Sequence, residues 1–325
     1  MSWPLRLGLV STARINSAIL GAASELDEVQ VVAVASRDGA RAQAYAREHG
    51  IERWHGSYDA LLDDDGVDAV YISLPNGMHH EWTMKALEAG KHVLCEKPYS
   101  RHPEEAEEAF ALAKQARLVL TEAFMYRHHP QAAKVKELVE EGAVGQVQLV
   151  RSSFSFVLRD QSDVRVQPTL DGGALMDLGA YCVSGSRFLV GEPERVAGEQ
   201  ILGPTGVDVA FHGTMRFPGD VVAQFDCSFT QPRYQRMDVV GDSGWLLVDS
   251  PFRSQGEGEL LVRHQEHLNR IEVPAADAYV LELQNFADAI GRRSPPLLTG
   301  ADVVGQARAI AGLYLSATEG RAVDL

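Results

Sequence analysis

Two patterns of hydrophobic and polar positions follow one another along this chain. As far as Glu122, short apolar runs alternate with segments whose apolar residues recur every three or four positions. The run Val29–Ala35 is dense in β-branched residues, which is typical of a strand buried on both faces of a sheet. Because strands and helices alternate, we expect an α/β fold with a doubly wound, parallel Rossmann sheet and right-handed crossovers. Strands are expected at residues 5–10, 29–35, 67–74, 91–95 and 118–120, and helices at 14–23, 39–50, 79–89 and from 103 onward.

Beyond Glu122, apolar and polar residues alternate with a period of two. This pattern occupies Gln146–Val157 and several short segments between Val196 and Val273. It predicts a large, mostly antiparallel open sheet with one face covered by helices. We therefore predict two domains, a dinucleotide-binding domain over 1–122 and an α+β substrate-binding and oligomerisation domain over 123–325. The helices of the second domain are expected at residues 130–141, 173–190, 279–292 and 301–318.

Composition and charge narrow the function classes. Hydrophobic residues make up 45% and charged residues 23% of the chain, as in ordinary globular proteins. The formal net charge of −15 argues against nucleic acid, whose binders need a basic surface. No apolar run approaches the roughly 18 residues that a membrane span needs. The three cysteines have no paired spacing, so we expect reduced thiols, a cytoplasmic location and no metal site.

The first strand leads into a turn that suits a dinucleotide pyrophosphate at a helix N-terminus. Ser11, Ala13 and Asn16 stand where the glycines of the G-x-G-x-x-G/A fingerprint would fall. Ala13 still allows close backbone approach, Ser11 can hydrogen-bond a phosphate and Arg14 can neutralise it. Taken alone, the segment is equally consistent with a structural βα turn.

The end of the second strand bears on which cofactor is bound. Proteins that bind NAD usually place a carboxylate there for the ribose 2′-hydroxyl. This chain has Ser36 and Arg37 instead, which suit the 2′-phosphate of NADP. Asp38 is interpreted with Gly39 as a turn and helix start. We therefore predict NADP in preference to NAD.

Two further strand ends carry polar residues. Pro75 and Asn76 follow the apolar run that ends at Leu74, and Asn76 supplies an amide near the expected path of the nicotinamide. His79, near the next helix start, is either a cofactor contact or a structural histidine. Glu96-Lys97-Pro98 follows another buried run, at the sheet edge where open α/β sheets bind ligands.

A second chemical element lies downstream. Asp177 and Tyr181 are four residues apart, so they share one face of a helix. Removing hydride from an alcohol also requires a base for the hydroxyl proton. Tyrosine has a pKa of about 10, and a nearby cation favours its ionised form. We predict Tyr181 as acid/base, Lys97 as that cation and Asp177 as an orienting carboxylate; glycines 172 and 173 would let the backbone pass close to the cofactor.

These motifs together resemble the Gfo/Idh/MocA oxidoreductase family over nearly the whole length. The tyrosine at position 181, where many members have histidine, is similar to the branch with dimeric dihydrodiol dehydrogenase, D-xylose dehydrogenases and ketosugar reductases. The resemblance implies that Lys97 is catalytic, that the open sheet forms a dimer interface and that the Lys97-Pro98 bond is cis. The predicted cofactor-binding residues are Ser11, Thr12, Ala13, Arg14, Ile15, Ser36, Arg37, Leu74, Pro75, Asn76, His79, Glu96, Lys97 and Arg127.

The leading functional hypothesis is an NADP-dependent oxidoreductase that oxidises an aldose at C1 or reduces a ketosugar, acting as a homodimer or homotetramer. A trans-1,2-dihydrodiol dehydrogenase is one alternative, and a non-catalytic NADP-sensing regulator is another. Intact Lys97, Asp177 and Tyr181 argue against the sensor, which needs no proton-transfer group. The side chains considered for sugar selectivity are Arg127, Phe156, Arg165 and Tyr279.

Overall fold

The structure is a computed structural model that describes residues 4–325. Its contacts divide the chain into two compact units, which we describe separately. The first contains the chain up to Ser100, Glu104–Met125 and Asp277–Val303; the second contains Arg101–Pro103, Tyr126–Ala276 and Val304–Leu325. The contact-based division thus places residues 277–303 with the first unit. The boundary after residue 122 stays a prediction.

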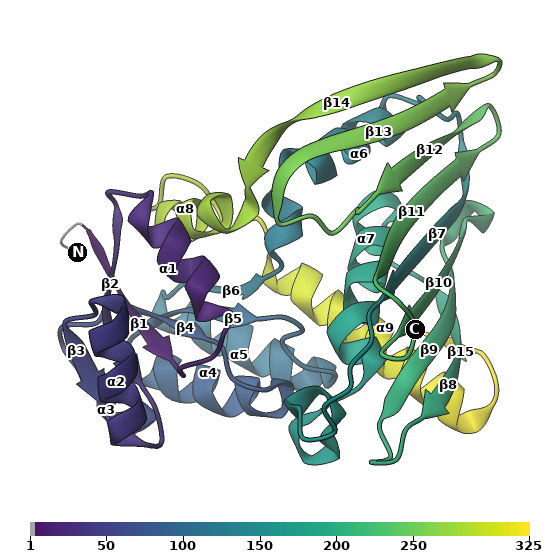
Figure 1. Ribbon diagram of the computed structural model, residues 1–325. Coiled ribbons are helices and arrows are strands. Elements are labelled where there is room, and N and C mark those ends of the chain that lie inside the picture. Colours follow the sequence, from purple (N-terminus) through teal and green to yellow (C-terminus); the bar gives the residue numbers. More distant parts are fainter. Residues whose placement is uncertain (1–3) are drawn as a thin grey trace. The chain divides into compact units, whose positions relative to one another are not determined.

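The first unit is built on a six-stranded parallel sheet, which confirms the expected Rossmann architecture (Figure 1). The strand order is β3-β2-β1-β4-β5-β6. The strands are β1 (Leu5–Val10), β2 (Val29–Ala35), β3 (Arg53–His55), β4 (Ala69–Ile72), β5 (His92–Glu96) and β6 (Leu120–Ala123). The sequence pattern missed β3 and the helix α3 (Tyr58–Leu62), because elements of three and five residues are too short to show a period.

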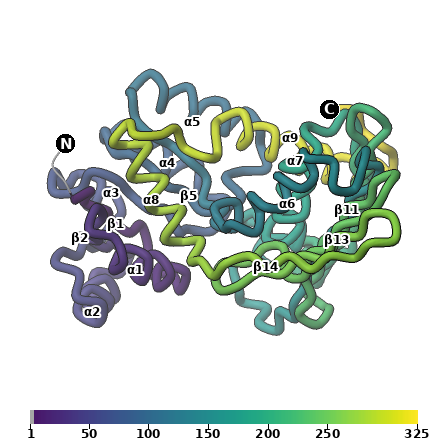
Figure 2. The backbone as a smooth tube through the Cα atoms, turned by 90° about the horizontal axis from the view of Figure 1, so that it is seen from above, coloured from purple at the N-terminus to yellow at the C-terminus, as the bar shows by residue number. Residues whose placement is uncertain are grey.

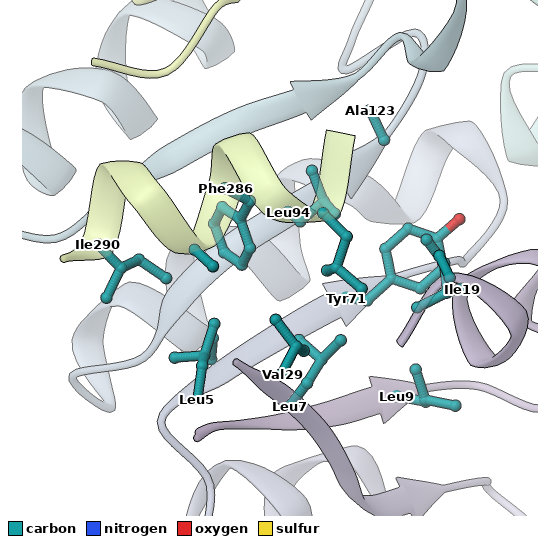
Figure 3. Close-up of a cluster of buried hydrophobic side chains, with 14 of the residues drawn as sticks. Leu5, Leu7, Leu9, Ile19, Val29, Tyr71, Leu94, Ala123, Phe286 and Ile290 are labelled. Atoms are coloured by element: carbon teal, nitrogen blue, oxygen red, sulfur yellow. The ribbon is translucent and has the colours of Figure 1, made fainter. Parts of the chain in front are cut away.

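Helices cover both faces of this sheet (Figure 1). They are α1 (Asn16–Ser24), α2 (Gly39–His49), α4 (His79–Glu88), α5 (Pro103–Ala116) and α8 (Ala278–Ile290). The last of these packs against α1 and directs Phe286 and Ile290 onto Leu5, Leu94 and Tyr71 of the sheet (Figure 3). Burying a side chain such as Phe286 stabilises a fold by roughly 1.5–3 kcal/mol, so hydrophobic burial is what holds this distant segment to the first unit.

The second unit contains a nine-stranded sheet with the order β14-β13-β12-β11-β7-β10-β9-β8-β15. Only the central pair β7–β10 is parallel among the strand pairings described, which agrees with the predicted, mostly antiparallel sheet. The strands are β7 (Val147–Ser155), β8 (Arg195–Leu202), β9 (Asp208–Arg216), β10 (Val222–Ser228), β11 (Tyr234–Gly241), β12 (Gly244–Asp249), β13 (Gln255–His264), β14 (His267–Asp277) and β15 (Val323–Asp324).

Helices α6 (Pro130–Glu140), α7 (Ala180–Val190) and α9 (Gly300–Glu319) lie on one face of this sheet (Figure 1). Figure 2 shows β13 and β14 as a long hairpin at one edge. Within residues 4–325, no helix is both long and apolar enough to cross a membrane.

Candidate active site

The carboxyl ends of β1 and β4 meet at the point where the strand order of the first sheet reverses, which is where open α/β sheets bind ligands. The hydroxyls of Ser11, after β1, and Ser73, after β4, lie 2.7 Å apart. Asn16 joins both loops, because its amide donates to the Ser11 carbonyl (2.8 Å) and accepts from the Ser73 hydroxyl (2.6 Å). Sequence reasoning missed Ser73, although its place directly before Leu74 at a strand end was a usable signal.

Ser11 keeps the backbone of the glycine that it replaces. Its φ of 137° lies in the region that favours glycine. Its buried hydroxyl lies beside Ser73 and accepts from the Ala13 amide (3.0 Å). The expected role of this hydroxyl in phosphate binding stays a prediction; in the structure it shapes the loop. The following helix α1 has no side-chain cap and no acidic residue in its first turn among the described residues. The amides of Asn16, Ser17 and Ala18 already donate to the carbonyls of Ala13, Arg14 and Ile15, so a bound anion would have to meet the turn that precedes α1.

At the end of β2, the Asp38 carboxylate accepts from the amides of Ala40 (2.9 Å) and Arg41 (3.2 Å). This contact confirms the interpretation of Asp38 as the start of α2. Ser36 is buried, and its hydroxyl accepts from the Asp38 amide (3.2 Å). Arg37 and Asp38 are both exposed, so a cation and a carboxylate stand at consecutive positions of this edge.

His79 opens α4 and is fully buried. Its Nε2 lies 2.8 Å from the Leu74 carbonyl, and its Nδ1 lies 3.0 Å from the Pro98 carbonyl. Burial lowers the pKa of His79, whereas the two carbonyls oppose that shift, because only a ring protonated on both nitrogens donates to both. The ring therefore joins the loop after β4 to the loop after β5. This geometry favours a positioning role over the direct cofactor contact that was one of the two expectations.

The tripeptide Glu96-Lys97-Pro98 lies at the end of β5, and its Lys97-Pro98 bond is cis, as expected. The buried Tyr71 donates its hydroxyl to Glu96 Oε1 (2.5 Å). Glu96 Oε2 accepts from the Lys97 amide (3.2 Å). The Lys97 side chain is only partly buried. Tyr71 and the Lys97 amide thus hold the Glu96 carboxylate in place. The partly buried Lys97 follows β5 at the ligand edge of the sheet.

The glycine pair in the second unit is required by internal packing. A Cβ at Gly172 would lie 2.5 Å from the Arg165 carbonyl oxygen. Gly173 has a φ of 139°, and a Cβ there would collide with the Asp208 carboxylate and the Tyr314 hydroxyl. Packing within the second unit therefore explains why both positions are glycine, and the expected close approach of this backbone to the cofactor stays a prediction.

Asp208 holds the start of the helical segment that carries Asp177. Its buried carboxylate accepts from the Leu175 amide (2.7 Å) and from the Tyr314 hydroxyl (2.9 Å). Burial raises the pKa of Asp208. Sequence reasoning missed this residue, since nothing in the order of residues links position 208 to position 175.

Leu175–Gly179 forms a π-helical turn that leads directly into α7. Such turns are frequent at functional sites. Asp177 lies in this turn and Tyr181 in α7. Asp177 accepts from Arg165 Nε (2.8 Å), whose guanidinium also pairs with Asp163. Arg165, considered for sugar selectivity, therefore orients Asp177 within the same unit.

Tyr181 is only 8% exposed and is surrounded by aromatic rings. Ring centroids lie at 5.3 Å for Phe252, 5.4 Å for Phe154 and 5.8 Å for Tyr126. The Tyr126 hydroxyl is in turn 2.7 Å from the Ser184 hydroxyl. These contacts restrict the ring of Tyr181. Sequence analysis missed Phe154 and Phe252, which come from distant strands and loops.

The remaining predicted residues divide by position. Ile15 packs against the hydrophobic core, whereas Arg14 is exposed. Arg127 is largely buried, with its guanidinium 4.0 Å from the Phe188 ring centroid, and Phe156 packs against Phe229. Leu74 is buried, and the residues that are partly buried are Thr12, Ala13, Pro75, Asn76 and Tyr279. No group of three or more histidine, cysteine or acidic side chains suited to a metal occurs in the part of the chain that the structure describes.

Comparison with known proteins agrees with this geometry. Residues 5–124 match the profile of an oxidoreductase family with an NAD-binding Rossmann fold, and residues 132–247 match the GFO/IDH/MocA C-terminal domain. The chain is 37% identical to D-xylose 1-dehydrogenase (NADP(+)) 2 of Haloferax volcanii, over 99% of this chain and 100% of that protein. It is 34% identical to trans-1,2-dihydrobenzene-1,2-diol dehydrogenase of Danio rerio, over 89% and 86% of the two chains.

Among solved structures, a 3-ketoreductase from Actinomadura kijaniata in complex with NADP and TDP-benzene superimposes with a TM-score of 0.91. The two chains are 30% identical, and the match covers 96% of this chain and 98% of that one. Both halves of the sequence and the whole fold are thus accounted for by one family. This chain belongs to the Gfo/Idh/MocA oxidoreductases.

Proposed function

We propose that this chain is an NADP(H)-dependent oxidoreductase that transfers hydride between the nicotinamide and a sugar, either oxidising an aldose at C1 or reducing a ketosugar. The observation that carries the proposal is the full-length likeness to an NADP-dependent D-xylose dehydrogenase. The preference for NADP is supported by Asp38, whose side chain caps α2. Ser36 and Arg37, which precede it, are of the residue types that bind a 2′-phosphate.

In this proposal, bound NADPH would supply the hydride for reduction, or bound NADP+ would accept it in oxidation, and residues of the chain transfer the proton. Tyr181 exchanges the proton of the substrate hydroxyl, and the ammonium of Lys97 favours the phenolate. Asp177, held by Arg165, orients the substrate. The predicted cofactor residues at the ends of β1, β2, β4 and β5 bind NADP, with the pyrophosphate at the start of α1. His79 positions the loops after β4 and β5 through its contacts with the Leu74 and Pro98 carbonyls.

The function is tested by a panel of D-xylose, other pentoses, hexoses and benzene dihydrodiol, each with NADP and with NAD, followed by the absorbance of the reduced cofactor. Ketosugar reduction is followed as loss of NADPH. Activity on an aldose or a ketosugar with NADP(H) is expected. Activity on dihydrodiols alone would replace the sugar proposal with the second candidate, which the likeness to a dihydrobenzenediol dehydrogenase favours.

Replacing Arg37 with Gln should weaken NADP binding by roughly 10- to 100-fold, because a charge-assisted hydrogen bond is worth about 1.5–3 kcal/mol. NAD has no 2′-phosphate, so its affinity should stay within a few-fold. Isothermal titration with both cofactors measures the difference. The control is Arg47→Gln, an exposed arginine at the other end of α2. An equal loss for NADP and NAD would contradict this role for Arg37.

We also propose that the chain forms a homodimer or homotetramer through the open face of its nine-stranded sheet. A shallow groove on the sheet is lined by Arg151, His212, Arg236 and Asp238 among others, so both charge signs are present for a self-complementary contact. Sedimentation at micromolar concentration should show a dimer or tetramer, and Arg151→Glu should shift it toward monomer. A monomeric parent protein would count against this proposal.

The buried thiols of Cys95, Cys182 and Cys227 support a cytoplasmic location.

A further inference from the structure

Glu282 is a buried carboxyl group that the proposed mechanism does not use. It lies in α8, is 2% exposed, and neither carboxyl oxygen has a hydrogen-bond partner within residues 4–325. Its neighbours Leu283 and Phe286 anchor α8 in the core of the first unit, so the side chain cannot swing to solvent without disturbing that packing (Figure 3). A buried carboxylate without donors is costly, and such a group calls for an explanation.

The groups around Glu282 identify which member of the cluster holds a proton. Glu282 interacts electrostatically with the carboxylates of Glu96 in β5 and Glu122 in β6. It also interacts electrostatically with Tyr71 of β4 and Tyr279 of α8. Burial first, and then these two carboxylates, raise the pKa of Glu282 well above its usual value.

Glu96 and Glu122 differ from Glu282 in having donors. Glu96 accepts from the Tyr71 hydroxyl and the Lys97 amide, and Glu122 Oε1 accepts from the Tyr99 amide (2.7 Å). Hydrogen bonds to a carboxylate favour its ionised form. These donors favour the charged form at Glu96 and Glu122, whereas burial without a donor favours the neutral form at Glu282.

We propose that Glu282 is a positioning residue for the cofactor edge, kept as a neutral carboxylic acid so that Glu96 stays ionised and in place beside Lys97. The inference rests on the proposed function, since it concerns the edge that would bind NADP. Ionisation of Glu282 at alkaline pH would set a third negative charge against Glu96 and Glu122. Repulsion would then loosen the contacts of Glu96 with Tyr71 and with the Lys97 amide, and with them the cofactor surface.

The first test is the pH dependence of stability, which needs no substrate or cofactor. A carboxyl whose folded pKa is raised supports folding most below its unfolded pKa of about 4.3. Its contribution falls as pH rises, until the folded pKa is passed. Glu282→Gln stays neutral, so its Tm relative to the parent should rise between pH 5 and 9. Glu88→Gln makes the same change at an exposed position of α4 and should show no such trend.

The second test is NADPH affinity, followed by nicotinamide fluorescence from pH 6 to 10. The NADPH affinity of the parent protein should fall as the pH rises into the alkaline range. The affinity of Glu282→Gln should show no such fall. Glu282→Met serves the same comparison if the glutamine variant does not fold. A Tm difference that does not change with pH would overturn the neutral acid. A pH-dependent Tm difference with identical affinity profiles would overturn the positioning role. Absence of NADPH binding at every pH would instead count against the proposed function, and the stability test would still report on the proton.

Discussion

Replacing Lys97 with Met should lower turnover by about 10²-fold or more, the range associated with loss of proton-transfer assistance. Methionine keeps the unbranched apolar stem but removes the ammonium, so the Tyr181 phenolate would lose its stabilising cation. NADP affinity should stay within a few-fold of that of the parent protein, because the proposed contacts of the chain with the pyrophosphate and the 2′-phosphate do not involve Lys97. Steady-state turnover and fluorescence titration of NADPH measure the two effects separately.

The matched control for Lys97 is Lys85→Met, a partly buried lysine of α4 that pairs with Glu81 (2.8 Å). Its turnover should equal that of the parent protein. Loss of NADPH binding together with turnover in Lys97→Met would assign Lys97 to cofactor binding rather than to proton transfer.

Replacing Tyr181 with Phe is the second change with a large expected effect, again about 10²-fold or more in turnover. The aromatic ring and its packing against Phe154 and Phe252 are retained, so Tm should barely change. The control is Tyr126→Phe, which removes a hydroxyl from the same aromatic cluster, where it contacts Ser184. That variant should keep most of its turnover.

Comparing the two variants also separates an enzyme from a cofactor sensor. A sensor would bind NADPH in the parent protein and in both variants, and none of the three would turn over a substrate from the panel. Parent-like turnover in both Lys97→Met and Tyr181→Phe would exclude the proposed proton transfer, because neither the phenol nor the ammonium would then be needed.

Much of the fold was accessible from local patterns. Continuous apolar runs predicted the buried parallel strands, because a strand covered on both faces has no polar side to show. Period-two alternation predicted the second sheet, which is covered on one face. The cap at Asp38 was also predicted, since a side chain that accepts from amides two and three residues ahead is a local interaction. Elements as short as β3 and α3 were missed, since three to five residues contain no full period.

For the candidate site too, some features follow from local sequence and others do not. Residues that end buried strands could be placed at the ligand edge, because in a parallel sheet all such ends lie on one side. That rule is the basis for predicting Ser11, Arg37, Asn76 and Lys97 as site residues. The roles of individual side chains at that edge were a different matter. His79 bonds two backbone carbonyls that follow different strands, and no spacing in the sequence indicates that both would reach its ring.

Periodicity was enough to predict the fold class, and short local motifs were enough to predict the family. These motifs are the tripeptide at 96–98, Pro75-Asn76 with His79, and the glycine pair that leads to Asp177 and Tyr181. Each depends on residues close together in the chain. Other features depend on residues that are distant in sequence and meet only after folding. Gly173 makes room for Asp208, Arg165 holds Asp177, and α8 brings a protonated Glu282 to Glu96. Burial and hydrogen-bond partners, which set the charge state and orientation of these groups, exist only in the folded chain.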